Sequence, residues 1–280
     1  MLRDDTAHEE RIGSRDLASW TTPLGRAIAR TGVGLGRSAV RLGAWSAANV
    51  VLLLTALIGG LAVVGLTSLT AEVYESVVEA DGLAGLDQPV LDAAIGWRNA
   101  GLDHAVTFYT DVGGPIGMPV LAALATIAMV WRWRSRTPLV LMVIAVAGSL
   151  AMTITGKELI GRARPPRSLA VPPFESSPSF PSGHTLNATV ITGVVVYLLL
   201  RRLDSARART ATVLAGACFV VSMGLSRVFL GHHWLTDVVA GWALGLAWVA
   251  VVVTAHRLYL TVRRETPEQP AASGDRATSS

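Results

Sequence analysis

The sequence has few charged residues and a single cysteine, and each shortage excludes a class of protein. Charged residues make up 16% of the 280 residues, whereas a soluble globular domain has about 25%. Intrinsic disorder is excluded because it requires low hydrophobicity and a high net charge. A disulfide-stapled scaffold is excluded because one cysteine, Cys218, cannot form an internal disulfide.

Hydrophobic residues, in contrast, make up 51% of the chain, and they are gathered in long uncharged runs. A helix that spans a bilayer needs about 20 such residues. The runs predict six transmembrane helices, and therefore an all-α, polytopic membrane protein whose helices pack as a bundle. A cleaved signal peptide does not explain the first run, which is too long and follows a long N-terminal arm. The six runs are Ala47–Leu69 and the stretches between Asp111 and Arg132, Arg136 and Lys157, His184 and Arg201, Arg209 and Arg227, and Asp237 and His256.

The distribution of arginine predicts how these helices are oriented. A net charge of +4 would suggest nucleic acid binding in a soluble protein, but the arginines gather in segments that six spans place on one side. Residues 1–45 contain seven of them, 131–138 three, 201–209 four and 257–276 four. On the other side, we predict a loop over residues 71–112, which contains eight acidic residues and one arginine. The positive-inside rule therefore places both termini in the cytoplasm, and we expect no nucleic acid partner.

Composition also divides the chain into three parts. Residues 46–258 form the six-helix domain, 1–45 a basic cytoplasmic arm, and 259–280 a cytoplasmic tail predicted to be disordered. Four arginines of the arm share one helical face and could lie on anionic headgroups, but three glycines favour an irregular arm that only sets the topology. These residues are Arg26, Arg30, Arg37 and Arg41, and Gly32, Gly34 and Gly36.

Four basic residues break the charge pattern because they lie on the predicted outer side. They are Lys157, Arg162, Arg164 and Arg167. A lysine at a helix end can simply snorkel to the interface, but the positive-inside rule disfavours four outer cations. We therefore expect an anion to compensate them, and phosphate fits because arginine donates bidentate hydrogen bonds to it.

A second candidate segment, 179–184, ends where the fourth run begins. Pro181 and Gly183 predict a tight turn into a helix, whose first N–H groups have no partner within the helix. Such a helix end favours an anion. Ser182 and His184 add a hydroxyl donor and a titratable imidazole, although alone they could equally be an N-cap serine and an interfacial histidine.

A third candidate segment, 226–237, contains two adjacent histidines. On a helix, His233 and Asp237 lie on one face because they are four residues apart. His232 is five residues from Asp237, about 140° away around the helix. The carboxylate can fix the tautomer of His233 and leave its other nitrogen free as a nucleophile. We therefore predict that His233 is the reactive histidine and that His232 faces solvent or lipid headgroups.

The three segments together form one spaced pattern. Its parts are Lys157 with Arg164-Pro165, then Pro181-Ser182-Gly183-His184, then Ser226-Arg227 with His233 and Asp237. This pattern resembles the three-part signature of the type 2 phosphatidic acid phosphatase superfamily, with every position filled. Agreement in order and spacing across three segments is far more specific than a match to any one motif. The resemblance covers about residues 87–256.

The resemblance implies a role for each signature residue. His233 would attack phosphorus and form a phosphohistidine, with Asp237 orienting it. His184 would protonate the leaving oxygen and then activate water. No metal or other cofactor is expected, because side-chain cations do the work of a metal and no cluster has ligand spacing. The residues expected to hold the phosphate oxygens are Lys157, Arg164, Ser182, Gly183 and Arg227.

The expected function is therefore that of a metal-independent lipid phosphatase with its active site at the outer membrane interface. The resemblance leaves open whether the substrate is a polyprenyl diphosphate such as undecaprenyl diphosphate, phosphatidate or phosphatidylglycerol phosphate. Composition and the lack of an organelle signal suggest a bacterial plasma membrane. Three alternatives are disfavoured. Vanadate-dependent haloperoxidases of this superfamily are soluble, a lipid-phosphate binding or transport protein needs no nucleophile, and a structural membrane protein would leave the cation cluster unexplained.

Overall fold

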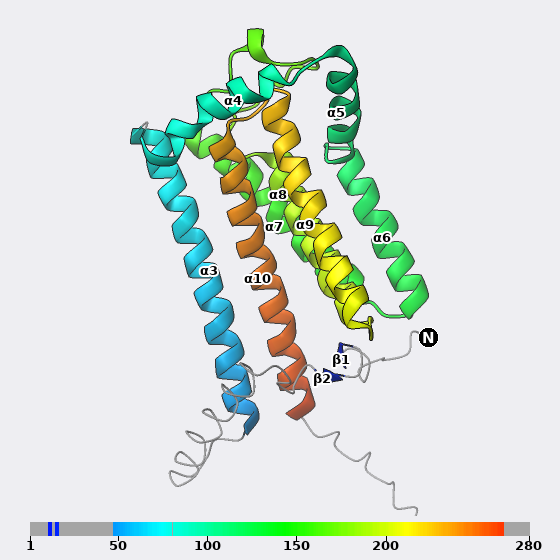
Figure 1. The fold of residues 1–280 in the computed structure, drawn as a ribbon. Helices are drawn as coiled ribbons and strands as arrows, with labels where there is room; N and C mark the ends of the chain where they lie inside the picture. The colour runs from blue at the N-terminus through cyan, green and yellow to red at the C-terminus, as the bar shows by residue number, and fades with distance from the viewer. Residues whose placement is uncertain (1–10, 13–14, 17–46, 80, 266–280) are drawn as a thin grey trace, which may run out of the picture.

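The computed structural model describes residues 11–12, 15–16, 47–79 and 81–265 (Figure 1). The predictions for the N-terminal arm and for the tail beyond Glu265 lie largely outside these residues. Two short strands, β1 (Arg11–Ile12) and β2 (Arg15–Asp16), pair antiparallel. The helices are α3 (Ala47–Glu79), α4 (Asp87–Gly96), α5 (Ala100–Val112), α6 (Gly117–Trp133), α7 (Thr137–Ile160), α8 (Gly183–Leu200), α9 (Ala206–Phe229) and α10 (Leu235–Glu265), with 3-10 turns η1 (Gly82–Leu86) and η2 (Arg167–Leu169).

The predicted all-α membrane bundle is confirmed. Within the described residues, five helices are each long and apolar enough to span a membrane: α3, α7, α8, α9 and α10. Helices α5 and α6 meet at an angle of 49° and form a sixth span when they are counted together. The bend lies at the sequence Gly113-Gly114-Pro115, where two glycines and a proline end one helix before the next begins.

Two boundaries differ from the sequence prediction. Segment 71–112, predicted as an acidic loop, is mostly helical, because α3 continues to Glu79 and is followed by η1, α4 and α5. Asn99 starts α5 by accepting a hydrogen bond from the N–H of Leu102 at 3.0 Å. At the other end of the chain, α10 continues to Glu265, seven residues beyond the predicted end of the helical domain at 258.

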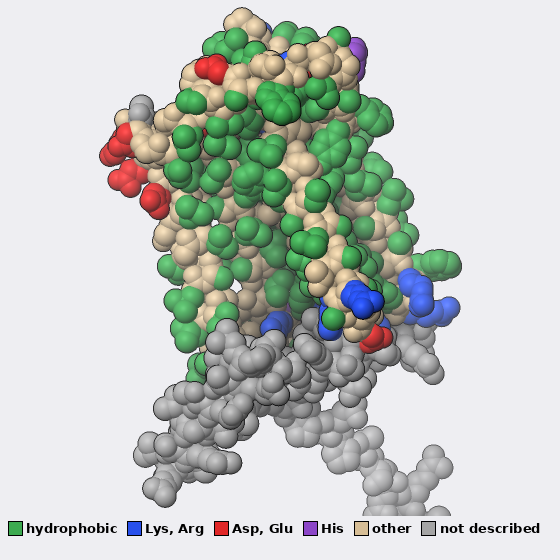
Figure 2. Space-filling view, in the orientation of Figure 1, with side chains coloured by type: hydrophobic (Ala, Val, Ile, Leu, Met, Phe, Trp, Pro, Cys, Tyr) green, Lys and Arg blue, Asp and Glu red, His purple; other side chains and the backbone are tan. Residues whose placement is uncertain are grey.

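Helix α8 is the centre of the bundle. It packs against α6, α7, α9 and α10, and its buried side chains, among them Leu186, Val190 and Val194, form the main apolar core. Helix α3 lies at the edge, against α10 (Figure 1). Many large apolar side chains of α3 and α6 are exposed, as lipid-facing side chains would be. Apolar side chains cover the middle of the visible face in Figure 2, with most of the basic side chains at one end and most of the acidic ones at the other.

Candidate active site

The three signature segments meet at one end of the bundle, the upper end in Figure 1. The end of α7, the loop 161–182 and the start of α8 lie beside the end of α9 and the start of α10. A backbone hydrogen bond of 3.1 Å from the N–H of Ser182 to the carbonyl of Asp237 joins the starts of α8 and α10. Gly241 allows this contact, because a Cβ there would lie only 3.1 Å from the carbonyl oxygen of Ser182. Small residues permit such close approach of transmembrane helices.

His233 and Asp237 are brought together, as predicted. Nδ1 of His233 lies 3.4 Å from Oδ2 of Asp237, and both side chains are almost completely buried. Ser179, which the sequence analysis gave no role, links them: its hydroxyl lies 3.3 Å from Nδ1 of His233 and donates to Oδ2 of Asp237 at 2.5 Å. The other ring nitrogen, Nε2, lies 3.1 Å from a guanidinium nitrogen of Arg164. Since guanidinium only donates, Nε2 presents its lone pair to that side.

The predicted reason for this pairing, a shared face of one helix, was wrong. His233 lies in the turn before α10, which begins at Leu235, so His233 and Asp237 do not share a helix. Asp237 instead reaches back over the first turn, and its Oδ2 accepts from the N–H of Trp234 at 2.9 Å. This is one half of a capping box. The carboxylate that faces His233 therefore also starts α10.

The pKa of His233 favours the neutral imidazole. Burial lowers this pKa well below its ordinary value, and the positive charges of Arg164 and Arg227 lower it further. At neutral pH the ring is therefore uncharged, and a neutral ring with a proton on Nδ1 has a free lone pair on Nε2. That is the protonation state which a nucleophile requires.

Arg162 supports Asp237 from the other side. One guanidinium nitrogen of Arg162 donates to Oδ1 of Asp237 at 2.6 Å, and the other donates to Asp87 at 2.7 Å. Asp87 also accepts from the N–H and the hydroxyl of Thr236. The two ion pairs of Arg162, with Asp87 and with Asp237, thus connect the start of α4 to the start of α10. The charge of Arg162 is therefore compensated within the protein. The expectation that an external anion compensates all four outer cations is wrong for this residue.

The three predicted phosphate-binding cations lie at this same end of the bundle. Arg164 donates to the carbonyl of His232 at 2.6 Å and to that of Ser177 at 2.7 Å. Arg227 is 2% exposed, and Thr110 of α5 orients it by accepting a hydrogen bond of 3.0 Å. Lys157 donates to the carbonyl of Pro178 and, at 3.2 Å, to the hydroxyl of Ser177. The cationic groups are therefore held in place by backbone carbonyls and hydroxyls.

The start of α8 contains the other two residues that the sequence predicts to bind phosphate. We call the five predicted groups the phosphate cradle: Lys157, Arg164, Arg227, Ser182 and the N–H of Gly183. Helix α8 begins at Gly183 with Ser182 as its N-cap residue, so its first N–H groups have no partner within the helix. His184 lies in the first turn, and Nε2 of its ring would lie 3.5 Å from a Cβ at Gly114. The bend between α5 and α6 therefore leaves room for this imidazole.

His232 is not where the sequence predicted it. The side chain is 5% exposed, and its Nε2 lies 2.7 Å from the carbonyl oxygen of Val171. Its Nδ1 is buried without a hydrogen-bond partner among the described residues and lies 4.0 Å from Oε1 of Glu175. Burial lowers the pKa of His232, and the charge of Arg227 contributes. His232 is thus a buried neighbour of the cradle rather than a solvent-facing residue.

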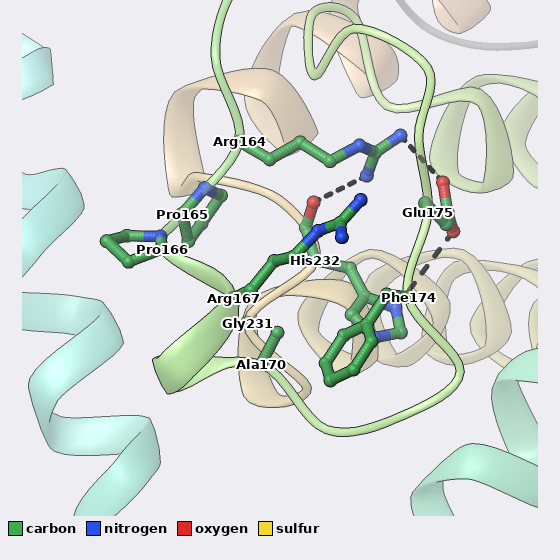
Figure 3. Close-up of a pocket in the computed structure, with 9 residues that line it drawn as sticks. All are labelled: Arg164, Pro165, Pro166, Arg167, Ala170, Phe174, Glu175, Gly231 and His232. Carbon is green, nitrogen blue, oxygen red and sulfur yellow. Dashed lines mark hydrogen bonds and ion pairs between the residues drawn. The ribbon is translucent and has the colours of Figure 1, made fainter.

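Glu175 also belongs to this site, although it was not predicted from the sequence. Its carboxylate forms an ion pair of 2.6 Å with Arg164 and a second ion pair with Arg227. Its segment borders a cavity of about 300 Å³ lined by Arg164, Pro165, Pro166, Arg167, Ala170, Phe174, Glu175, Gly231 and His232 (Figure 3). Glu175 is the one acidic residue in the loop 161–182. Its isolation among arginines was the sequence feature that could have indicated an ion pair at the site.

No group of three or more His, Cys, Asp or Glu side chains in the described part of the chain is arranged to hold a metal ion. Positive charge at the site comes from Lys157, Arg164 and Arg227, which all contact the segment 175–178, and such groups favour the binding of an anion. With a neutral imidazole beside them, the arrangement can bind a phosphate group and transfer it to a nitrogen nucleophile.

The chain is similar to known proteins over much of its length. The model of the PAP2 superfamily matches residues 137–259, which include all the predicted site residues. Phosphatidylglycerophosphatase B of Bacillus subtilis (strain 168) is 30% identical over 176 residues, 62% of this chain and 85% of that protein. The fold resembles a crystal structure described as the first transmembrane PAP2 type phosphatidylglycerolphosphate phosphatase from Bacillus subtilis. The TM-score is 0.64 at 24% identity, over 74% of this chain and 98% of that one.

Proposed function

From the premise that the chain belongs to the PAP2 superfamily and is a membrane lipid phosphatase, we propose that it hydrolyses a lipid phosphate through a phosphohistidine on His233. The observation that carries this proposal is the orientation of the His233 ring. Nδ1 faces Asp237 and Ser179, whereas Nε2 faces Arg164 of the phosphate cradle. The nitrogen with the lone pair is therefore the one that faces the cradle.

In the first step, Nε2 of His233 attacks phosphorus in line with the bond to the lipid oxygen. The N–P bond forms as the P–O bond to the lipid breaks, and His184 gives its proton to the departing oxygen. The dephosphorylated lipid leaves. Asp237 stabilises the positive charge that develops on the ring of His233, and Arg162 and Ser179 keep that carboxylate in place.

In the second step, water attacks the phosphohistidine. His184, now neutral, takes a proton from the water as its oxygen bonds to phosphorus. The N–P bond breaks, His233 regains its lone pair, and inorganic phosphate leaves. In both steps Lys157, Arg164, Arg227, the hydroxyl of Ser182 and the N–H of Gly183 hold the equatorial oxygens. Phosphoryl transfer depends mainly on such positioning and charge stabilisation.

The proposed substrate is phosphatidylglycerophosphate, whose terminal phosphate is a monoester. Support comes from the names of the Bacillus subtilis protein and of the structural neighbour, together with the coverage of that relative. The cavity of about 300 Å³ beside the cradle has room for a polar headgroup. The apolar, exposed faces of the surrounding helices would leave the acyl chains in the bilayer.

The substrate is tested by incubating purified protein in detergent micelles with phosphatidylglycerophosphate, phosphatidate or undecaprenyl diphosphate, each in excess EDTA. We expect the fastest phosphate release from phosphatidylglycerophosphate, and no loss of rate in EDTA because side chains supply the cations. The His233→Ala protein, prepared identically, measures contaminating phosphatase. Release only after Mg²⁺ is added would contradict the mechanism, and faster release from undecaprenyl diphosphate would contradict the substrate.

We further propose that the site faces the outside of a bacterial plasma membrane and that both ends of the helical domain face the cytoplasm. The exposed basic residues Arg132, Arg136 and Arg207 lie at the opposite end of the bundle from the cradle. The exposed acidic residues Glu72, Glu75 and Glu79 lie at the end of α3 on the cradle side. This distribution fits the positive-inside rule.

The orientation is tested with single cysteines in a Cys218→Ser background. Ser168 and Asp204 are exposed positions on the cradle side and on the opposite side, respectively. A membrane-impermeant maleimide added to intact cells should label Ser168→Cys and leave Asp204→Cys unlabelled until the membrane is opened. The reverse pattern would place the active site in the cytoplasm.

A further inference from the structure

The carboxylate of Glu175 lies inside the phosphate cradle. It pairs with Arg164 at 2.6 Å and with Arg227, two of the three cations expected to hold phosphate. Figure 3 shows it between Arg164 and His232. A planar carboxylate with two oxygens, each on a different guanidinium, uses the same donors that two oxygens of a phosphate group would use.

The carboxylate also lies near the proposed nucleophile, because its partner Arg164 places a guanidinium nitrogen 3.1 Å from Nε2 of His233. Burial raises the pKa of Glu175, but the positive charges of Arg227 and Arg164 outweigh this effect and lower the pKa to about 2, so the carboxylate is ionised at neutral pH. Arg164 thus contacts both Glu175 and the proposed nucleophile. The transferred phosphoryl group must also lie beside Nε2 of His233.

The residues that follow Glu175 occupy further donors of the cradle. Ser177 and Pro178 accept hydrogen bonds from both Lys157 and Arg164. The segment 175–178 therefore contacts all three cations, through one carboxylate and several neutral oxygens. Phosphate and this segment cannot use the same donors at one time.

We propose that Glu175 is an internal competitor that occupies the phosphate position and that the substrate must displace. The proposal rests on the proposed function of the cradle and adds to it a residue that sets the affinity for the phosphate group. If the carboxylate stayed in place, its negative charge would repel the phosphate oxygens at close range. Binding therefore includes the cost of breaking two ion pairs, and the negative charge of Glu175 weakens binding.

The cavity beside the cradle gives the displaced side chain somewhere to go. Glu175 is partly exposed, with 29% of its side chain accessible, and it borders this cavity rather than being packed on all sides. Arg167 lines the same cavity, with its guanidinium 6.0 Å from the ring centroid of Phe174. It forms no ion pair with any residue of the described ranges, so its positive charge is available to the displaced carboxylate.

The test measures binding of inorganic phosphate to the full-length protein in detergent by titration calorimetry, which requires no turnover. Glu175→Gln keeps the size of the side chain and removes its charge. We expect this variant to bind phosphate about tenfold more tightly than the wild type, the effect of losing one competing charge-assisted interaction. Glu175→Ala should bind more tightly as well, and it serves if the glutamine variant is unstable. In lipid hydrolysis, KM should fall while kcat changes less.

The matched control is Glu75→Gln, the same charge change at an exposed position on α3, and its phosphate affinity should equal that of the wild type. A structural role for Glu175, in which it only positions the two arginines, predicts weaker phosphate binding in both variants. Equal or weaker binding in both would overturn the proposal. Failure of the wild type to hydrolyse any lipid phosphate would overturn the proposed function instead, and it leaves the binding result intact.

Discussion

Replacing His233 with alanine is expected to lower phosphate release by about 10⁵-fold, because no other side chain is placed to form the covalent intermediate. The ring of His233 is the one imidazole in the described site with a carboxylate and a hydroxyl on one nitrogen and a guanidinium on the other. The loss is measured as inorganic phosphate released from a lipid phosphate. The intermediate is measured separately by rapid alkaline quenching with radiolabelled substrate, since phosphohistidine survives base.

The adjacent histidine supplies the control. His232→Ala should retain activity within about tenfold of the wild type, because its ring does not contact Asp237, the acid that orients the proposed nucleophile. Its Nε2 faces the carbonyl of Val171 instead. Label trapped on the His233→Ala protein, or a dead His232→Ala protein that still folds, would show that the nucleophile is assigned to the wrong residue.

Most of the fold could be predicted from the sequence because the lipid environment makes long apolar runs unambiguous. Each of the six runs corresponds to a helix or, for α5 and α6, to a bent pair. The prediction was less accurate outside the membrane. Helices α4 and α5 are short, and α5 is amphipathic rather than uniformly apolar, so their sequence resembled a polar loop.

The signature residues of the site could also be predicted, because the chemistry needs those residue types in a fixed order. The residues that form hydrogen bonds and ion pairs with them could not be predicted. Asp87, Ser179 and Glu175 reach the site only through tertiary contacts with Arg162, Asp237 and Arg227. Such contacts join segments that are far apart in the sequence, and no local pattern identifies which residues will be the partners.

The pairing of His233 with Asp237 shows how a correct prediction can have an incomplete reason. Helical spacing suggested that the two share a face, but the histidine precedes the helix. What holds them together is the capping role of Asp237 and the bridging hydroxyl of Ser179. Spacing alone also led to the wrong environment for His232, which the same turn buries beside the cradle.

Replacing Asp237 with asparagine should have the second largest effect, a fall in kcat of about 10³- to 10⁴-fold, by analogy with the acid of a Ser-His-Asp triad. The wild-type carboxylate accepts hydrogen bonds from Arg162, Ser179 and the N–H of Trp234, so all its neighbours are donors. An amide group must turn its NH₂ towards one of them, and it brings no negative charge to the ring of His233. The imidazole then loses the preference for a proton on Nδ1, and Nε2 is less often free to attack.

A matched variant separates that effect from loss of fold. Asp92→Asn makes the same change at an exposed position on α4, where the carboxylate accepts from Gln88, and it should leave kcat unchanged. Both proteins are compared by thermal unfolding in detergent before the assay. The Asp237→Asn protein should still form the phosphohistidine, only slowly, because its nucleophile remains in place, whereas His233→Ala forms none. Folded Asp237→Asn protein with kcat within tenfold of the wild type would mean that the tautomer of His233 is fixed by Ser179 alone, and that Asp237 serves only to start α10.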